Sequence, residues 1–198
     1  MRNDLPVQVS GGLFIFLAAA LLILPFEWVL AAIIAATFHE LCHIVAIKLC
    51  GCKITAISLG IGGAQIQMST MGQGRELICA LAGPLGGILL LIPFRIFPRL
   101  ALCALMHSLY NLIPVYPLDG GRALRCGAAL LLPPLTADRL CVCVQRLCLC
   151  VLFLLGMWGC MVLRLGFLPL VLAAGVVIKS GMIKIPCKHG MKRVQWCR

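Results

Sequence analysis

Residues 28–47 are apolar along almost their whole length, yet they contain the run His-Glu-Leu-Cys-His. The stretch is long enough to cross a bilayer, which takes about 20 apolar residues. Ionisable groups at membrane depth are costly unless a partner compensates them. Because residues four apart share one face of a helix, His39 and His43 can bind one metal ion, with Glu40 beside them. The pattern therefore constrains the chain to a membrane-spanning helix with a zinc site inside it.

The composition places the rest of the chain in the same environment. Charged residues make up only 12% of the chain and hydrophobic residues 62%, whereas soluble domains have about 25% charged residues. We therefore predict an all-α integral membrane protein with about six transmembrane helices, each near the length that spans a bilayer. The predicted spans are residues 9–24, 28–49, 77–97, 100–115, 140–163 and 167–178.

Residues 53–69, between the second and third spans, have a different pattern. They are rich in β-branched residues, partly alternating, and interrupted by Gly60, Gly62 and Gly63. This pattern predicts a small β-hairpin at the membrane surface. The third span contains Gly83-Pro84, so it is either one span or a re-entrant hairpin.

The basic residues predict the orientation. If six spans begin inside, all of the 17 Lys and Arg residues except Arg95, Arg99 and Arg164 fall on the cytosolic side. We therefore expect a multi-pass protein of the cell membrane with both termini cytosolic. Residues 1–178 are predicted to form one polytopic domain, and residues 179–198 a basic cytosolic tail near anionic lipid.

The N-terminus and the charge exclude two other interpretations. The N-terminal run is expected to be the first span and not a signal peptide, because Arg2 is balanced by Asp4 and no cleavage site precedes a soluble domain. Nucleic-acid binding is not expected, because the chain shows no basic domain and no aromatic platform.

The 13 cysteines do not have the spacing of a structural zinc site. Most lie in apolar stretches, where cysteine acts as a small hydrophobic residue. On the cytosolic side thiols stay reduced. We expect inert thiols, with Cys187 and Cys197 in the tail as the pair to watch.

Two histidines leave a catalytic zinc ion short of ligands, because such sites have three protein ligands and a water molecule. The carboxylates and imidazoles that remain as candidates are Glu27, Glu76, His107, Asp119 and Asp138. Asp119 is favoured because Pro114 and Pro117 precede it. Prolines free backbone groups, which is tolerated at membrane depth only beside a cavity or within packed protein. The alternative is that Asp119 caps the following helix.

His107 lies one helical turn before Asn111 in an apolar span. It is either a partner or gate of the site, or a structural histidine bonded to neighbouring backbone. The second interpretation is the commoner case and is favoured from the sequence.

Three motifs together resemble those of site-2 proteases, the M50 intramembrane zinc metalloproteases. They are HELCH at residues 39–43, AGPLGG at residues 82–87 and NLIPVYPLDGG at residues 111–121. The resemblance covers residues 5–132. The compact form is most similar to the stage IV sporulation protein FB branch, whose members process a membrane-tethered pro-sigma factor.

This resemblance implies a role for each motif residue. It implies that His39, His43 and Asp119 hold zinc, that Glu40 is the catalytic base, and that Asn111 lies near the substrate. The chain departs from the family at Gly87, where members often carry Asn. It also has only about twenty residues after the last predicted span, where the sporulation branch usually carries a regulatory CBS domain. Control through a regulatory membrane protein is therefore expected.

The sequence therefore predicts a zinc-dependent intramembrane endopeptidase that cleaves a membrane-anchored protein near the cytosolic face. Such a substrate must be extended before cleavage, and the predicted hairpin offers an edge to which a strand can add. One alternative is a protease that clears signal-peptide remnants. A catalytically silent binding protein is disfavoured because Glu40 is retained. A metal transporter is disfavoured because it predicts polar residues spread over more spans.

Overall fold

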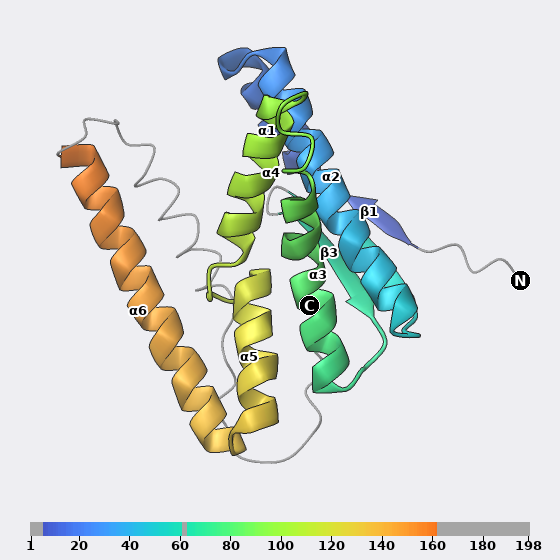
Figure 1. Cartoon of the computed structure of the whole chain (residues 1–198), viewed down its shortest axis with the longest axis vertical. Helices are drawn as coiled ribbons and strands as arrows, with labels where there is room; N and C mark the ends of the chain where they lie inside the picture. The colour runs from blue at the N-terminus through green and yellow to red at the C-terminus, as the bar shows by residue number, and fades with distance from the viewer. Residues whose placement is uncertain (1–5, 61–62, 162–198) are drawn as a thin grey trace, which may run out of the picture. The chain divides into compact units, whose positions relative to one another are not determined.

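The computed structural model describes residues 6–60 and 63–161 (Figure 1). These residues fall into two compact units that divide after Asn111. The first unit contains β1 (Val7–Val9), α1 (Gly11–Ile23), α2 (Phe26–Leu49), β2 (Ile54–Gly60), β3 (Gly63–Met68), α3 (Gln73–Leu89) and α4 (Pro98–Asn111). The second contains α5 (Asp119–Leu131) and α6 (Pro134–Met161).

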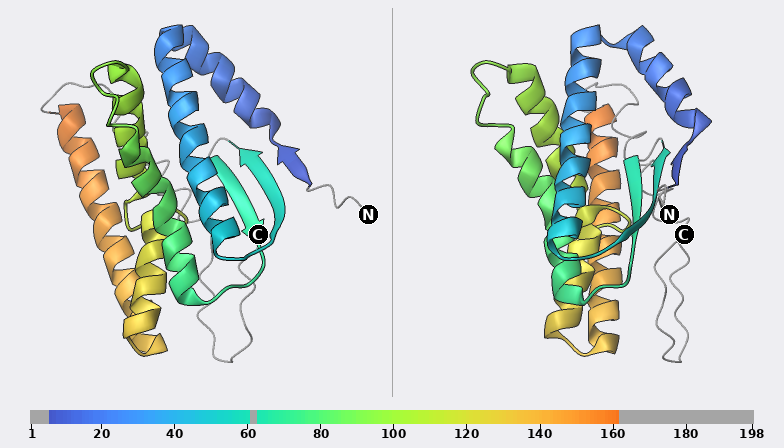
Figure 2. Two further views of the ribbon diagram at one scale, coloured as in Figure 1. Left: turned by 45° about the vertical axis from the view of Figure 1, so that its right-hand side comes forward. Right: turned by 90° about the vertical axis from the view of Figure 1, so that its right-hand side faces the viewer.

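Helix α2 packs against both α3 and α4, which also pack against each other (Figure 2). Its buried positions recur every four residues, which places them on one face of the helix. The repeating positions are Ala31, Ala35, His39, His43 and Ile47, and Val29 and Ala46 are buried as well. Helix α4 buries Ala101, Ala104 and Ser108. Small residues at these contacts let the helix backbones approach closely, as in membrane helix bundles.

Helix α3 continues through Pro84, which the sequence suggested as a break. The helix ends at Leu89, and turns fill most of the chain before α4 begins at Pro98. Residues 77–97 are therefore not one continuous helix. The helix needs its glycines, because a Cβ at Gly86 would meet Cys42 and a Cβ at Gly87 would meet Ser108.

The predicted hairpin is confirmed, since β2 and β3 pair antiparallel. A third strand, β1, pairs parallel with the other edge of β2, from Val7 opposite Ile57 to Val9 opposite Leu59. The sequence had assigned Val9 to the first span, and this was wrong. A strand of three residues is too short to show alternation, and its pairing depends on a partner far along the chain.

In the described ranges, α2 and α6 are the helices long and apolar enough to cross a membrane, and α1 is a shorter apolar helix. Helices α3 and α4 have 17 and 14 residues. The count of six spans therefore stays a prediction. The last predicted span and the basic tail, with Cys187 and Cys197, lie outside the described residues.

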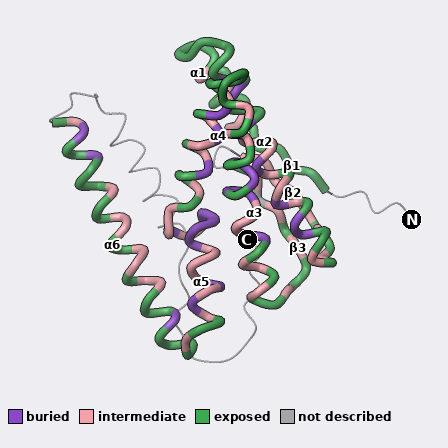
Figure 3. The backbone as a smooth tube through the Cα atoms, in the orientation of Figure 1, coloured by how far each residue is buried: buried purple, intermediate pink, exposed green. Residues whose placement is uncertain are grey.

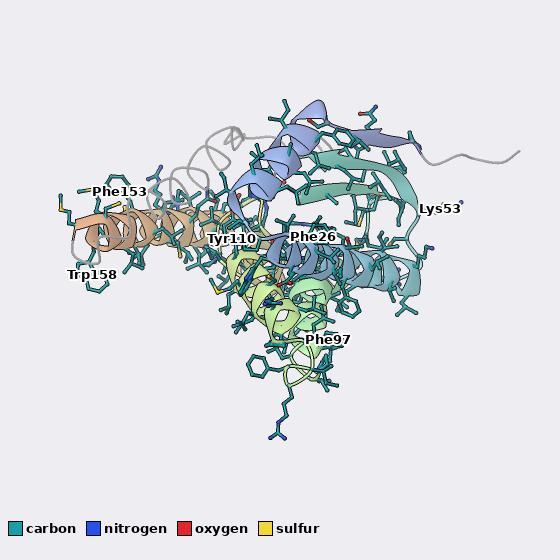
Figure 4. All side chains as sticks on the ribbon, turned by 90° about the horizontal axis from the view of Figure 1, so that it is seen from above. Phe26, Lys53, Phe97, Tyr110, Phe153 and Trp158 are labelled. Atoms are coloured by element: carbon teal, nitrogen blue, oxygen red, sulfur yellow. The ribbon has the colours of Figure 1, made fainter. Side chains whose placement is uncertain are left out.

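The second unit is an antiparallel pair in which α5 and α6 lie side by side (Figure 1). Helix α6 begins earlier than the predicted span, at Pro134. Figure 3 shows that α6 is exposed along most of its length. Phe153 and Trp158 stand out from it (Figure 4) and are about half exposed. Such a surface suits lipid, the environment predicted from the composition.

Candidate metal centre

His39 and His43 lie in the middle of the buried face of α2, with 2% and 7% of their surfaces exposed. Their Nε2 atoms are 3.2 Å apart. Two ligands at about 2.0–2.1 Å from a tetrahedral zinc ion are about 3.3 Å apart. The spacing of the two imidazoles therefore fits one shared ion.

The other ring nitrogen of His43 is held by α3. His43 Nδ1 lies 2.7 Å from the carbonyl oxygen of Cys79. Because a carbonyl only accepts, Nδ1 must carry the proton, which leaves the Nε2 lone pair for a metal. A backbone carbonyl in this position orients metal-binding histidines in many proteins.

Gly83 on α3 faces both imidazoles. A Cβ at this position would meet His43 Nε2 and lie 2.7 Å from His39 Nε2. Any side chain here would occupy the space between the two nitrogen atoms. The glycine thus keeps open the volume that an ion bound to both histidines needs.

Glu40 lies one residue along from His39 and faces the sheet. Its Oε1 accepts from the backbone N–H of Ala64 in β3 at 3.4 Å. The neighbouring Gly63 has a φ of 102°, which favours glycine. A Cβ added at this position would lie 3.7 Å from Oε1. Glu40 is nine residues before the end of α2, about 14 Å along the helix axis. The hairpin therefore extends along α2 to the level of the histidines.

The other candidates of the first unit have distinct surroundings. The ring of His107 on α4 contacts the ring of His39, with centroids 4.7 Å apart. Asn111 donates from Nδ2 to the carbonyl oxygen of His107 at 3.0 Å. Glu27 forms an exposed ion pair with Arg99 at 2.6 Å.

Two of the remaining candidates for a third ligand do not lie on a buried helix face. Glu76 is in the first turn of α3 and is partly exposed. Asp138, in the second unit, lies 3.8 Å from Arg125 and is largely exposed. Neither has the burial expected of a ligand at membrane depth.

Asp119 belongs to the second unit and is buried as the first residue of α5. Its Oδ1 lies 4.0 Å from Arg122. The N-cap position is occupied by Leu118, and Asp119 is the residue after it. The next residue, Gly120, lies against the preceding loop, because a Cβ added there would meet the backbone of Leu112.

Gly121 also lies close to the preceding loop, because a Cβ added there would meet the backbone of Val115 and Tyr116. The two glycines let the preceding loop fold tightly over the start of α5. The Pro-x-x-Pro-x-Asp-Gly-Gly pattern therefore fixes the position of a buried carboxylate within this unit.

Sequence reasoning missed three groups at this centre. The motif at residues 82–87 was noticed, but not the clearance that Gly83 gives the histidines. The Cys79 carbonyl and the Ala64 N–H are backbone groups, so no residue type signals them. Only the packing of α3 and β3 on α2 reveals them.

No family model matches the chain. A zinc metalloprotease of Methanocaldococcus jannaschii is 37% identical over 106 residues, a match that covers 46% of this chain and 31% of that protein. The chain thus matches less than a third of the length of this curated relative. In fold, the chain is similar to a site-2 protease from Methanocaldococcus jannaschii, with a TM-score of 0.63 over 96% of this chain and 97% of that chain, at 24% identity. The chain therefore shares the fold of that protease.

Proposed function

We propose that this protein is a zinc-dependent intramembrane endopeptidase of the site-2 protease type that cleaves a membrane-anchored protein. The observation that carries the proposal is the pair of Nε2 atoms on α2, 3.2 Å apart and facing a glycine. The similarity to a zinc metalloprotease and the fold shared with a site-2 protease support it.

Asp119 is proposed as the third protein ligand. His39, His43 and Asp119 are all buried, and two imidazoles with one carboxylate are a donor set that suits catalytic zinc.

Zinc bound there would act as a Lewis acid toward the scissile carbonyl and lower the pKa of a water molecule. Glu40 would accept the proton of the attacking water and later pass it to the leaving amine. The Ala64 N–H at 3.4 Å holds the Glu40 carboxylate in place through Oε1. His43 is kept in the required tautomer by the Cys79 carbonyl.

The substrate strand is proposed to add to β3. The strand order is β1-β2-β3, so within the described residues one side of β3 is an edge of the sheet. The Ala64 N–H that reaches Glu40 belongs to this strand, so a peptide paired at this edge would lie close to the proposed base. Asn111 uses one Nδ2 hydrogen within α4 and keeps a second hydrogen and Oδ1 for a substrate backbone.

The proposed setting is the cell membrane, with several spans and both termini cytosolic. The Glu27–Arg99 pair joins the first turns of α2 and α4, as expected if both helices enter the membrane from the same side. Regulation by a membrane protein partner is part of the proposal. A pro-sigma substrate in sporulation stays a prediction of the sequence resemblance alone.

The test is cleavage of tethered single-span substrates, including a pro-sigma-like protein and a signal-peptide remnant, by the full chain in reconstituted membranes. Glu40→Gln should lower the rate about 10²–10⁴-fold while zinc stays bound. Glu76→Gln is the matched control, because this acid lies outside the site, and should cleave like wild type.

Three outcomes would contradict the proposal. Equal cleavage by wild type and Glu40→Gln would remove Glu40 as the base. Bound zinc without cleavage of any substrate would favour a silent binding protein. Absence of zinc from the wild-type chain would overturn the site itself.

A further inference from the structure

His39 is the middle ring of a cluster of three imidazoles. His43, on the same helix, has its ring centroid 4.8 Å away at an interplanar angle of 79°. His107, from α4, has its centroid 4.7 Å away at 89°. His39 is only 2% exposed, and its ring contacts both of these imidazoles.

The two proposed histidine ligands are supported by different elements. His43 is oriented by α3, through the Cys79 carbonyl. Metal-binding histidines generally need such an outer partner, which fixes the ring and raises its basicity. For His39, the ring of His107 on α4 makes an edge-on contact from outside α2, so a second helix also lies against a proposed ligand.

The position of His107 is fixed by its neighbours on α4. The next residue, Ser108, is 1% exposed and packs against Gly87 of α3. Successive residues are about 100° apart around a helix, so seating Ser108 against α3 turns His107 toward α2. Asn111 Nδ2 bonds the carbonyl oxygen of His107 at 3.0 Å and closes this turn.

Ring packing alone does not explain an imidazole here. A perpendicular ring contact stabilises by about 0.5–1.5 kcal/mol, and phenylalanine makes it without polar atoms. Ionisable residues within membrane helices are rare and are usually functional. His107 lies in an apolar helix, and the proposed mechanism gives it no role.

We propose that His107 is a positioning residue, whose imidazole holds the ring of His39 so that its Nε2 faces the metal. This inference rests on the proposed function, because it assumes that His39 binds zinc. Helix α4 would then contribute to the centre in two ways, through Asn111 for the substrate and through His107 for the ring of His39.

The experiment measures zinc affinity of the full chain in detergent, by competition with a chromophoric chelator, together with the visible spectrum of the cobalt(II) form. His107→Phe keeps a ring and removes both nitrogen atoms. It should weaken zinc binding about 10- to 100-fold, the usual cost of losing an outer partner, and change the cobalt spectrum. His107→Gln keeps a polar nitrogen and should lose less affinity.

Met106→Leu, an exposed change on the neighbouring residue of α4, is the matched control and should bind zinc like wild type. Thermal unfolding of each metal-free variant shows whether it folds. If His107→Phe does not fold, the zinc affinity of His107→Gln tests the positioning role. Unchanged zinc affinity and cobalt spectrum in the folded variants would overturn the positioning role. Wild type that binds no zinc would instead overturn the proposed function on which it rests.

Discussion

Helices α2 and α6 are the longest of the described helices, with 24 and 28 residues, and both are apolar enough to cross a membrane. They differ in what they bury. Over its most apolar stretch α2 is 28% buried, whereas α6 is 6% buried. Hydropathy alone would treat the two helices alike, yet only α2 has a buried face that carries polar groups.

The reason lies in the residues of that face. On α2, Ala31 and Ala35 precede His39 and His43 at the same spacing, so neighbouring backbones come close and enclose the imidazoles. On α6, large side chains such as Phe153 and Leu154 are exposed. A row of small residues that leads to paired histidines therefore marks the helix that carries the proposed metal centre.

The largest expected effect that separates the two helices is on metal binding. His43→Ala removes one proposed ligand and the bond to the Cys79 carbonyl. It should weaken zinc binding by more than about 100-fold, because losing a ligand costs more than losing an outer partner, which costs about 10- to 100-fold. Cys143→Ser on α6 removes an exposed thiol and should leave the zinc affinity as it is. Competition titrations of both variants measure this. A loss of zinc affinity in Cys143→Ser as large as that in His43→Ala would contradict the placement of the metal on α2.

The next effect concerns the space between the histidines. Gly83→Ala places a methyl group against both Nε2 atoms and should weaken zinc binding by about 10- to 100-fold, equivalent to the 1–3 kcal/mol typical of overpacking. Gly74→Ala on the same helix is the control, because nothing lies within 4 Å of its Cβ.

Both substitutions add one methyl group to α3, and only the one at Gly83 meets the imidazoles, so a difference in zinc affinity comes from the site. If Gly83→Ala binds zinc as tightly as Gly74→Ala, the cleared space between the imidazoles has no part in metal binding.

The smallest effect tests the buried face of α2 without touching the centre. Ala35→Leu should lower the free energy of unfolding by about 1–3 kcal/mol through overpacking. Ala32→Leu, at an exposed position three residues earlier, should change the free energy of unfolding by less than about 0.5 kcal/mol. Unfolding in mixed detergent measures both. Equal destabilisation would mean that the two faces of α2 do not differ as described.

The sequence was sufficient for the parts of the fold that depend on local pattern. The helix that carries His39, Glu40 and His43 was predicted from its apolar run, and the β2–β3 hairpin from its glycines and alternation. Pro114 and Pro117 singled out Asp119 among the acids, and the structure buries it. Each of these depends on residues close together in the chain.

The parts that were missed depend on contacts between distant segments. Strand β1 exists because it pairs with β2. The contact of His107 with His39 depends on how α4 is rotated, which Ser108 against Gly87 fixes. A periodic pattern tells which face of a helix is buried, but it does not tell which residue of another helix it meets.

The most direct test of the account is the coordination of the metal in the purified full chain, measured by X-ray absorption at the zinc edge. A zinc ion held by His39, His43 and Asp119 predicts nitrogen and oxygen ligands at about 2.0–2.1 Å with the multiple scattering of two imidazoles, and a change of this spectrum in Asp119→Asn. A sulfur shell at about 2.3 Å would show that cysteines bind the ion instead. That result, or a chain that binds no zinc, would contradict the claim that the paired histidines of α2 form the catalytic centre.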